Sequence, residues 1–159
     1  MKIYYSDEPI FKELPEQFEH SLFLAGPTPR SSGVKGWRDE AISILNVMKY
    51  DGLVWVPELQ SKEAGQSEQF DYINQVQWEK WGLETCKKIV FWIPRSFPDM
   101  PGLTTNVEMG YYLAKSPEKC CYGRPEDSPK NKYIDWLFSK DTAKPIFKTL
   151  SNLLIFAIS

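Results

Sequence analysis

The sequence predicts an α/β protein with a mostly parallel sheet of four to five strands and helices on both faces. Two observations predict this class. Short, continuously apolar runs alternate along the chain with longer segments in which apolar residues recur at helical spacing. Each apolar run also ends in Gly or Pro and is followed by a polar loop. Such runs are typical of parallel strands that are buried on both sides and connected by crossover helices.

The elements follow in order from this alternation. The predicted strands are 21–25, 53–56, 89–93 and 119–122, with a short further candidate at 145–147. The predicted helices are 37–48, about 68–85, 105–113, 132–138 and 146–158. Because the chain contains no repeat, linker or low-complexity segment, we expect residues 1–159 to form a single domain. The loops that follow the strands share one rim of such a sheet, and this rim is the expected binding site.

Composition favours a soluble globular protein. The 159 residues are 42% hydrophobic and carry a net charge of −2, with acidic and basic residues interleaved, so no basic surface for duplex nucleic acid is expected. Charged residues follow Met1 almost at once, which argues against a signal peptide. The longest uncharged apolar run, 153–158, is too short to span a bilayer, so we expect no membrane partner.

Carboxylates remain as the candidate catalytic groups. Cys86, Cys120 and Cys121 form an odd set without a C-x-x-C pair, which fits a reducing cytoplasm. The only histidine, His20, precedes the first apolar run, so neither a zinc site nor a Ser-His nucleophile is favoured. The glycine-rich phosphate-binding loops of nucleotide triphosphate and dinucleotide sites do not occur. We therefore expect neither a metal nor a cofactor.

The segment 102–110 carries the most informative carboxylate, Glu108, because it places this residue in the first turn of a helix that follows an apolar strand. Two interpretations are open. Thr105 and Glu108 have the spacing of a capping box, in which each side chain accepts from the other residue's amide. Alternatively, the helix N-terminus lowers the pKa of Glu108 and keeps it ionised as a nucleophile or base.

Six segments in order resemble the nucleoside 2-deoxyribosyltransferase-like family. They are 22–27 (LFLAGP), 37–41 (WRDEA), 56–58 (VPE), 91–95 (FWIPR), 102–110 (GLTTNVEMG) and 123–125 (GRP), and the resemblance runs from about Ser21 to the C-terminus, leaving 1–20 as an N-terminal extension. It implies a flavodoxin-like doubly wound fold and cleavage of the N-glycosidic bond of a nucleoside or nucleotide. Glu108 matches the family's nucleophile, which forms a covalent glycosyl-enzyme that a second base (transferase) or water (hydrolase) resolves.

The remaining candidate site residues are predicted to bind substrate. Gly26 and Pro27, with Thr28 in the loop after them, let a ligand approach the backbone closely. Thr104, Thr105 and Asn106 can hydrogen-bond a sugar or a 5′ group, or can cap the helix. Trp92 and Trp37 can sandwich a base or lie in the core. Arg30 or Arg38 can meet a phosphate or remain solvated. Oligomers are common in the family, so Asn131 is a candidate for reaching the site of a neighbouring subunit in a homo-oligomer.

The sequence also departs from the family pattern. Well-studied members carry an Asp shortly before the third strand and another six residues before the nucleophile, and both help to bind and protonate the base. Here the first stretch, 85–88, reads TCKK, and the second position is Gly102, while Asp99 is three residues out of register. Without a general acid a poor leaving group departs slowly. The alternative functions are therefore a nucleotide-sensing module that has lost turnover, and a scaffold for interactions.

Overall fold

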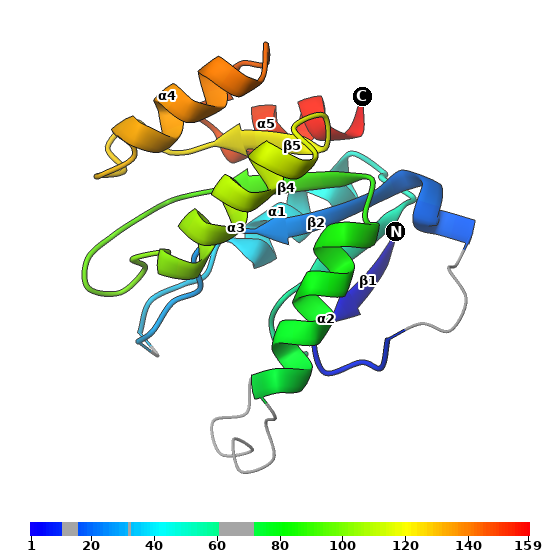
Figure 1. Ribbon diagram of the computed structural model, residues 1–159. Coiled ribbons are helices and arrows are strands. Elements are labelled where there is room, and N and C mark those ends of the chain that lie inside the picture. Colours follow the sequence, from blue (N-terminus) through cyan, green and yellow to red (C-terminus); the bar gives the residue numbers. More distant parts are fainter. Residues whose placement is uncertain (11–15, 32, 61–71) are drawn as a thin grey trace.

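The computed structural model describes residues 1–10, 16–31, 33–60 and 72–159. Within this part, an all-parallel six-stranded sheet has the order β1-β3-β2-β4-β5-β6 and is flanked by helices (Figure 1). The strands are β1 (Lys2–Tyr5), β2 (Ser21–Ala25), β3 (Leu53–Val56), β4 (Lys88–Trp92), β5 (Cys120–Gly123) and β6 (Ile146–Phe147). The helices are η1 (Glu16–His20), α1 (Arg38–Val47), α2 (Tyr72–Thr85), α3 (Leu103–Lys115), α4 (Lys132–Asp141) and α5 (Leu150–Ile158).

Two hydrophobic layers enclose the sheet, because successive side chains of a strand point to opposite faces. Phe23 of β2 packs on one face with side chains of α2, α3 and α4. Leu22 and Leu24 pack on the other face with side chains of α1 and α5. The central strands are buried on both faces, which explains why they read as continuous apolar runs.

The strand order is that of a flavodoxin-like doubly wound fold. Strands β3-β2-β4-β5-β6 form the five-stranded order of that fold, and β1 adds a further strand beside β3. The chain leaves β2 and β4, which are neighbours, toward different sides of the sheet. The loops after these two strands therefore diverge and leave a crevice, which is the usual ligand position in open parallel sheets.

Several element boundaries differ from the expected ones. Six strands replace the expected four to five, because Lys2–Tyr5 pairs in register with Leu53–Val56 at the edge of the sheet. The last helix begins at Leu150 and not at 146, since β6 precedes it and Thr149 caps it by accepting a hydrogen bond from the amide of Asn152. The expected helical residues 68–71, Phe70 among them, lie outside the described residues.

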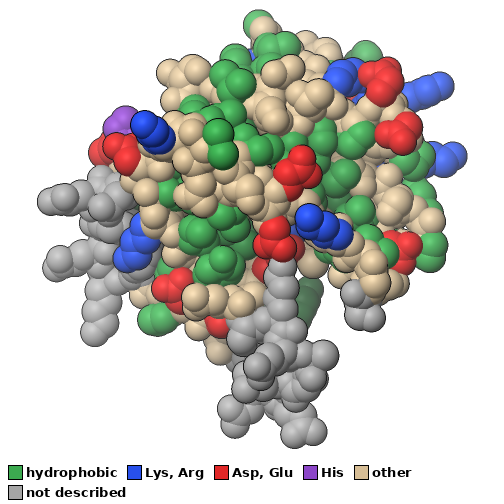
Figure 2. Space-filling model, turned by 180° about the vertical axis from the view of Figure 1, so that it is seen from behind, with side chains coloured by type: hydrophobic (Ala, Val, Ile, Leu, Met, Phe, Trp, Pro, Cys, Tyr) green, Lys and Arg blue, Asp and Glu red, His purple; other side chains and the backbone are tan. Residues whose placement is uncertain are grey.

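Among the helices that the structure describes, none has both the length and the apolar character that a membrane span requires. The face in Figure 2 shows positive and negative side chains interspersed, with no extended patch of one sign.

Candidate active site

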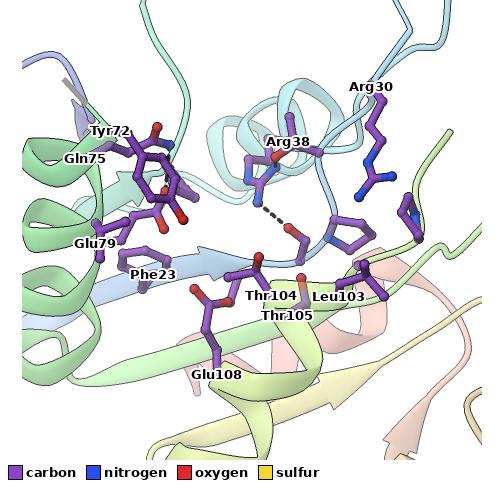
Figure 3. Close-up of a pocket in the computed structure, with 18 residues that line it drawn as sticks. Phe23, Arg30, Arg38, Tyr72, Gln75, Glu79, Leu103, Thr104, Thr105 and Glu108 are labelled. Atoms are coloured by element: carbon purple, nitrogen blue, oxygen red, sulfur yellow. Dashed lines mark hydrogen bonds between the residues drawn. The ribbon is translucent and has the colours of Figure 1, made fainter. Parts of the chain in front are cut away.

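A cavity of about 260 Å³ lies at the point where the loops after β2 and β4 diverge, and its volume is close to the lower end of the range of ligand pockets. The end of β2 and the loop after it form one wall, and α2 and the first two turns of α3 form the others (Figure 3). The cavity is thus on the face of the sheet covered by α2, α3 and α4. Its polar lining includes two carboxylates, Glu79 and Glu108.

Glu108 lies in the second turn of α3, one turn later than expected. The helix begins at Leu103, directly after Gly102, which has a left-handed backbone (φ 63°) and no side chain to cap the helix. Thr105 is therefore already inside the helix and cannot be its N-cap. The capping-box interpretation is wrong for this reason, and the side chain of Glu108 is directed into the cavity instead (Figure 3).

The pKa of Glu108 is raised to about 7, chiefly by burial and then by the negative charge of Glu79, while Arg38 acts in the opposite direction. The expected lowering of this pKa by the helix N-terminus is wrong. The dipole effect is confined to the first turn of a helix, and Glu108 lies beyond that turn. Glu108 consequently gains or loses its proton near neutral pH.

The sequence pattern did not lead us to expect Glu79 of α2 in the site. Burial raises its pKa, and Gln75, one turn earlier, donates a hydrogen bond from Nε2 to its Oε1 (2.7 Å). Glu79 lies three and four residues before Gly82 and Leu83, which are both buried against the sheet. A carboxylate on the apolar side of a predicted helix was the signal that could have found it. Helix and sheet are close here, because a Cβ on Gly82 would lie 2.7 Å from the Trp55 ring.

Arg38 lines the cavity and fixes the loop beside it. Its side chain is 2% exposed. It donates to the carbonyls of Leu24 (3.0 Å) and Gly26 (2.7 Å), to Thr28 Oγ1 (2.9 Å) and to Glu58 Oε1 (2.7 Å). The expected solvated position at the helix start is wrong, since this guanidinium is buried and holds the loop after β2 to the loop after β3. These bonds use most of its donors, so little remains for a phosphate.

Gly26, Pro27, Thr28 and Thr105, which were predicted to bind substrate, line the cavity. Position 26 requires glycine, but the reason is not the close approach of a ligand. A Cβ at Gly26 would lie 2.2 Å from the carbonyl oxygen of Trp92, so the neighbouring strand excludes any larger residue.

Trp92 and Trp37 lie in the core and not in the cavity. Trp92 packs with α1 and α5 on the opposite face of the sheet, because side-chain alternation along β4 directs it away from α2 and α3. Trp37 is also buried there, and its Nε1 donates to the carbonyl of Pro27 (3.1 Å). The structure therefore supports the core interpretation of both tryptophans over the base sandwich.

Asn106 and Asn131 bind a buried arginine, Arg95. Asn106 Oδ1 accepts from Arg95 Nη2 (2.6 Å), and Asn131 Oδ1 accepts from Nε and Nη2 (3.2 Å each). Asn131 is 2% exposed and also donates to Ser128, so its side chain is engaged within its own subunit and not at the surface. This network connects the start of α3 to the start of α4.

Asp99 does not take the place of the absent Asp residues at the cavity. Its carboxylate accepts a hydrogen bond from Ser31 Oγ (2.6 Å), and its carbonyl accepts from the amide of Arg30 (3.0 Å). It ties the loop after β4 to the loop after β2. Two carboxylates in a cavity at the crevice of a flavodoxin-like sheet are groups that can serve as a general acid or a nucleophile.

Comparison with known proteins identifies the family. The model of the family described as nucleoside 2-deoxyribosyltransferase like matches residues 19–127, more than half of the chain. The protein belongs to this family, which connects it with nucleosides in general. The match begins close to Ser21, where β2 starts, so β1 lies outside it. No match was found among curated proteins.

Proposed function

We propose that the protein cleaves the N-glycosidic bond of a nucleoside or nucleotide, with Glu108 as nucleophile and Glu79 as general acid. The observation that carries this proposal is the placement of both carboxylates in one cavity, at the ligand position of the fold, in a chain of this family. Glu79 supplies the acid that the missing Asp residues left unassigned. It reaches the cavity from a different position in the sequence.

The reaction proceeds in two steps that balance in atoms and charge. In the first, an oxygen of ionised Glu108 bonds to the anomeric carbon while the bond from that carbon to the base nitrogen breaks, and Glu79 donates its proton to the departing base. In the second, water or another base attacks the anomeric carbon, releases the Glu108 carboxylate and returns a proton to Glu79. Two displacements give net retention at that carbon.

Burial raises the pKa of each carboxylate, and the negative charge of Glu79 raises the pKa of Glu108 further. The proposed roles require a proton on Glu79 when Glu108 is ionised, and a bound base that accepts a hydrogen bond from Glu79 favours that state. The positive charge of Arg38 favours the ionised state of Glu108.

A catalytically inactive nucleotide sensor is the second candidate function. The absence of both family Asp residues favours it, because Gly102 and the 85–88 stretch offer no carboxylic acid for the base. Under this alternative the cavity binds the same ligands without turnover.

We further propose a cytoplasmic homo-oligomer. Leu103, Val107 and Tyr111 recur every four residues on α3, and all three are exposed. Such a stripe of large apolar side chains is typical of contact surfaces. Sedimentation of the purified protein measures the oligomeric state directly, and a monomer would contradict this part of the proposal.

The test is an incubation of purified protein with nucleosides and nucleoside monophosphates, with and without a second free base, followed by chromatographic separation of bases. We expect base release or exchange, its loss in Glu108→Gln, and retained ligand binding by that variant. The matched control is Glu118→Gln, since Glu118 is an exposed residue in the turn before β5. An active Glu108→Gln protein would exclude Glu108 as nucleophile, and binding without turnover in the wild type would favour the sensor.

A further inference from the structure

Resting on the proposed function, we propose that the substrate is a nucleoside 5′-monophosphate whose phosphate binds between Arg30 and the first turn of α3. The sequence left open whether the substrate carries a phosphate, and whether Arg30 or Arg38 would meet it. Three features of the cavity favour a phosphate at this place.

Arg30 supplies the positive charge. It lies in the loop after β2, lines the cavity and extends its side chain toward it (Figure 3). In the part of the chain that the structure describes, its guanidinium has no hydrogen bond or ion pair, whereas Arg38 is engaged with Glu58 and three oxygens of the β2 end. The backbone of Arg30 is fixed, because its amide donates to the carbonyl of Asp99 (3.0 Å). A fixed backbone with a free guanidinium is suited to bidentate binding of phosphate oxygens.

The first turn of α3 supplies backbone donors. Gly102 precedes the helix and offers no capping side chain, and the first amide of this turn with a carbonyl partner is that of Asn106, which donates to Gly102 (3.2 Å). The amides of 103–105 have no partner among the described residues. Free amides and the positive end of a 13-residue helix favour an anion.

Thr105 supplies the third indication of a ligand. The residue is 3% exposed, it lines the cavity, and Figure 3 shows its side chain directed inward. Its hydroxyl makes no hydrogen bond with another described residue and is not among the fully buried polar atoms, so it is open to the cavity. A phosphate oxygen there can accept a hydrogen bond from it.

The spacing agrees with one substrate bound along the cavity. Glu108 lies in the turn of α3 after the first one, and one turn rises about 5.4 Å along the helix axis. A pentose whose 5′ phosphate binds at the helix start can therefore extend toward Glu108. The phosphate would then lie at the start of α3, the sugar beside Glu108 and the base beside Glu79 of α2. No lining carboxylate lies at the phosphate end, since Glu79 and Glu108 line the other part (Figure 3).

The experiment compares one nucleoside with its 5′-monophosphate as substrates of the wild type, Arg30→Gln and Thr105→Val. In the wild type we expect kcat/KM for the monophosphate to exceed that for the nucleoside by on the order of 10- to 100-fold, as charge-assisted hydrogen bonds contribute. In Arg30→Gln this ratio should fall close to one, and in Thr105→Val it should fall in part. Lys35→Gln, an exposed cation of the same loop that does not line the cavity, should keep the wild-type ratio.

Failure of this inference can be distinguished from failure of the proposed function. Equal turnover of nucleoside and monophosphate would overturn the phosphate site and leave the glycosidic reaction standing. If no turnover occurs, binding is measured by calorimetry with Glu108→Gln. Tighter binding of the monophosphate that depends on Arg30 would support the phosphate site, and equal binding would overturn it. Inorganic phosphate alone should compete with the monophosphate in the wild type and lose this effect in Arg30→Gln.

Discussion

At the scale of single residues, Glu108 has opposite effects on activity and on stability. Its folded-state pKa is about 7 against an ordinary value of 4.5, so the folded protein binds more protons than the unfolded chain between these values. The free energy of unfolding therefore falls as pH rises through this window. We expect Glu108→Gln to abolish base release yet to stabilise the protein by about 1–3 kcal/mol at pH 8, with little gain at pH 4.5. Urea unfolding at both pH values measures this, and an equal effect at both would contradict it.

Glu79→Gln should slow base release about 100-fold, since a positioned general acid contributes at least this much. In the wild type the rate should rise as Glu108 ionises, near pH 7. Since the proposed role of Glu79 requires its proton, the rate should fall on the alkaline side as that proton is lost. The pH–rate profile of Glu79→Gln should keep the rise near pH 7 and lose the fall on the alkaline side. Its rate should recover on a nucleoside analogue whose leaving group needs no proton. An equal loss on both substrates would indicate a structural role for Glu79.

Substitution of Gln75, which donates a hydrogen bond to Glu79, tests the assignment of Glu79 as general acid. The groups that face Glu79 are Gln75 on its own helix, Arg38 of α1 and Glu108 of α3. The bond from Gln75 favours the ionised state of Glu79 and so lowers its pKa against the larger effect of burial. We expect Gln75→Leu to shift the alkaline fall of the pH–rate profile to higher pH. An unchanged profile in the variant would contradict the role of Glu79 as acid.

At the scale of elements, the start of α3 depends on Arg95. This buried side chain donates to Asn106 in the first turn of α3, to the carbonyl of Pro101 just before it, and to Asn131 at the start of α4. Truncation of the Arg95 side chain would leave several buried acceptors without donors. We expect Arg95→Met to destabilise the protein by about 2–4 kcal/mol in urea unfolding and to reduce turnover as well. Lys35→Gln is the surface control, and equal stability of the two variants would argue against the network.

At the scale of the whole molecule, the sequence predicted the central strands well, because strands buried on both faces are continuous apolar runs. It missed β1, whose edge position allows the exposed Lys2 and leaves a mixed pattern over four residues. It assigned Trp92 to the ligand because a strand position alone does not say which face of the sheet carries the ligand. The apolar side of α2 could have pointed to Glu79, but its place beside Glu108 could not be predicted, because the proximity of α2 to α3 arises from the packing of both helices on the sheet.

The added strand β1 is expected to be part of the cooperative unit although it lies outside the family match. Tyr4 is fully buried, and its ring packs edge-on against Trp55 of β3 with centroids 5.0 Å apart, on the same face of the sheet as the cavity. Removal of the Tyr4 side chain leaves a void in the hydrophobic layer between the sheet and α2, the helix that positions Glu79. We therefore expect Tyr4→Ala to cost about 3–5 kcal/mol in a single unfolding transition and to reduce turnover with it. Tyr133→Ala, at an exposed tyrosine of α4, should change stability by less than about 0.5 kcal/mol. Unfolding of β1 in a separate earlier transition, with activity retained, would instead show that the extension is dispensable for the site.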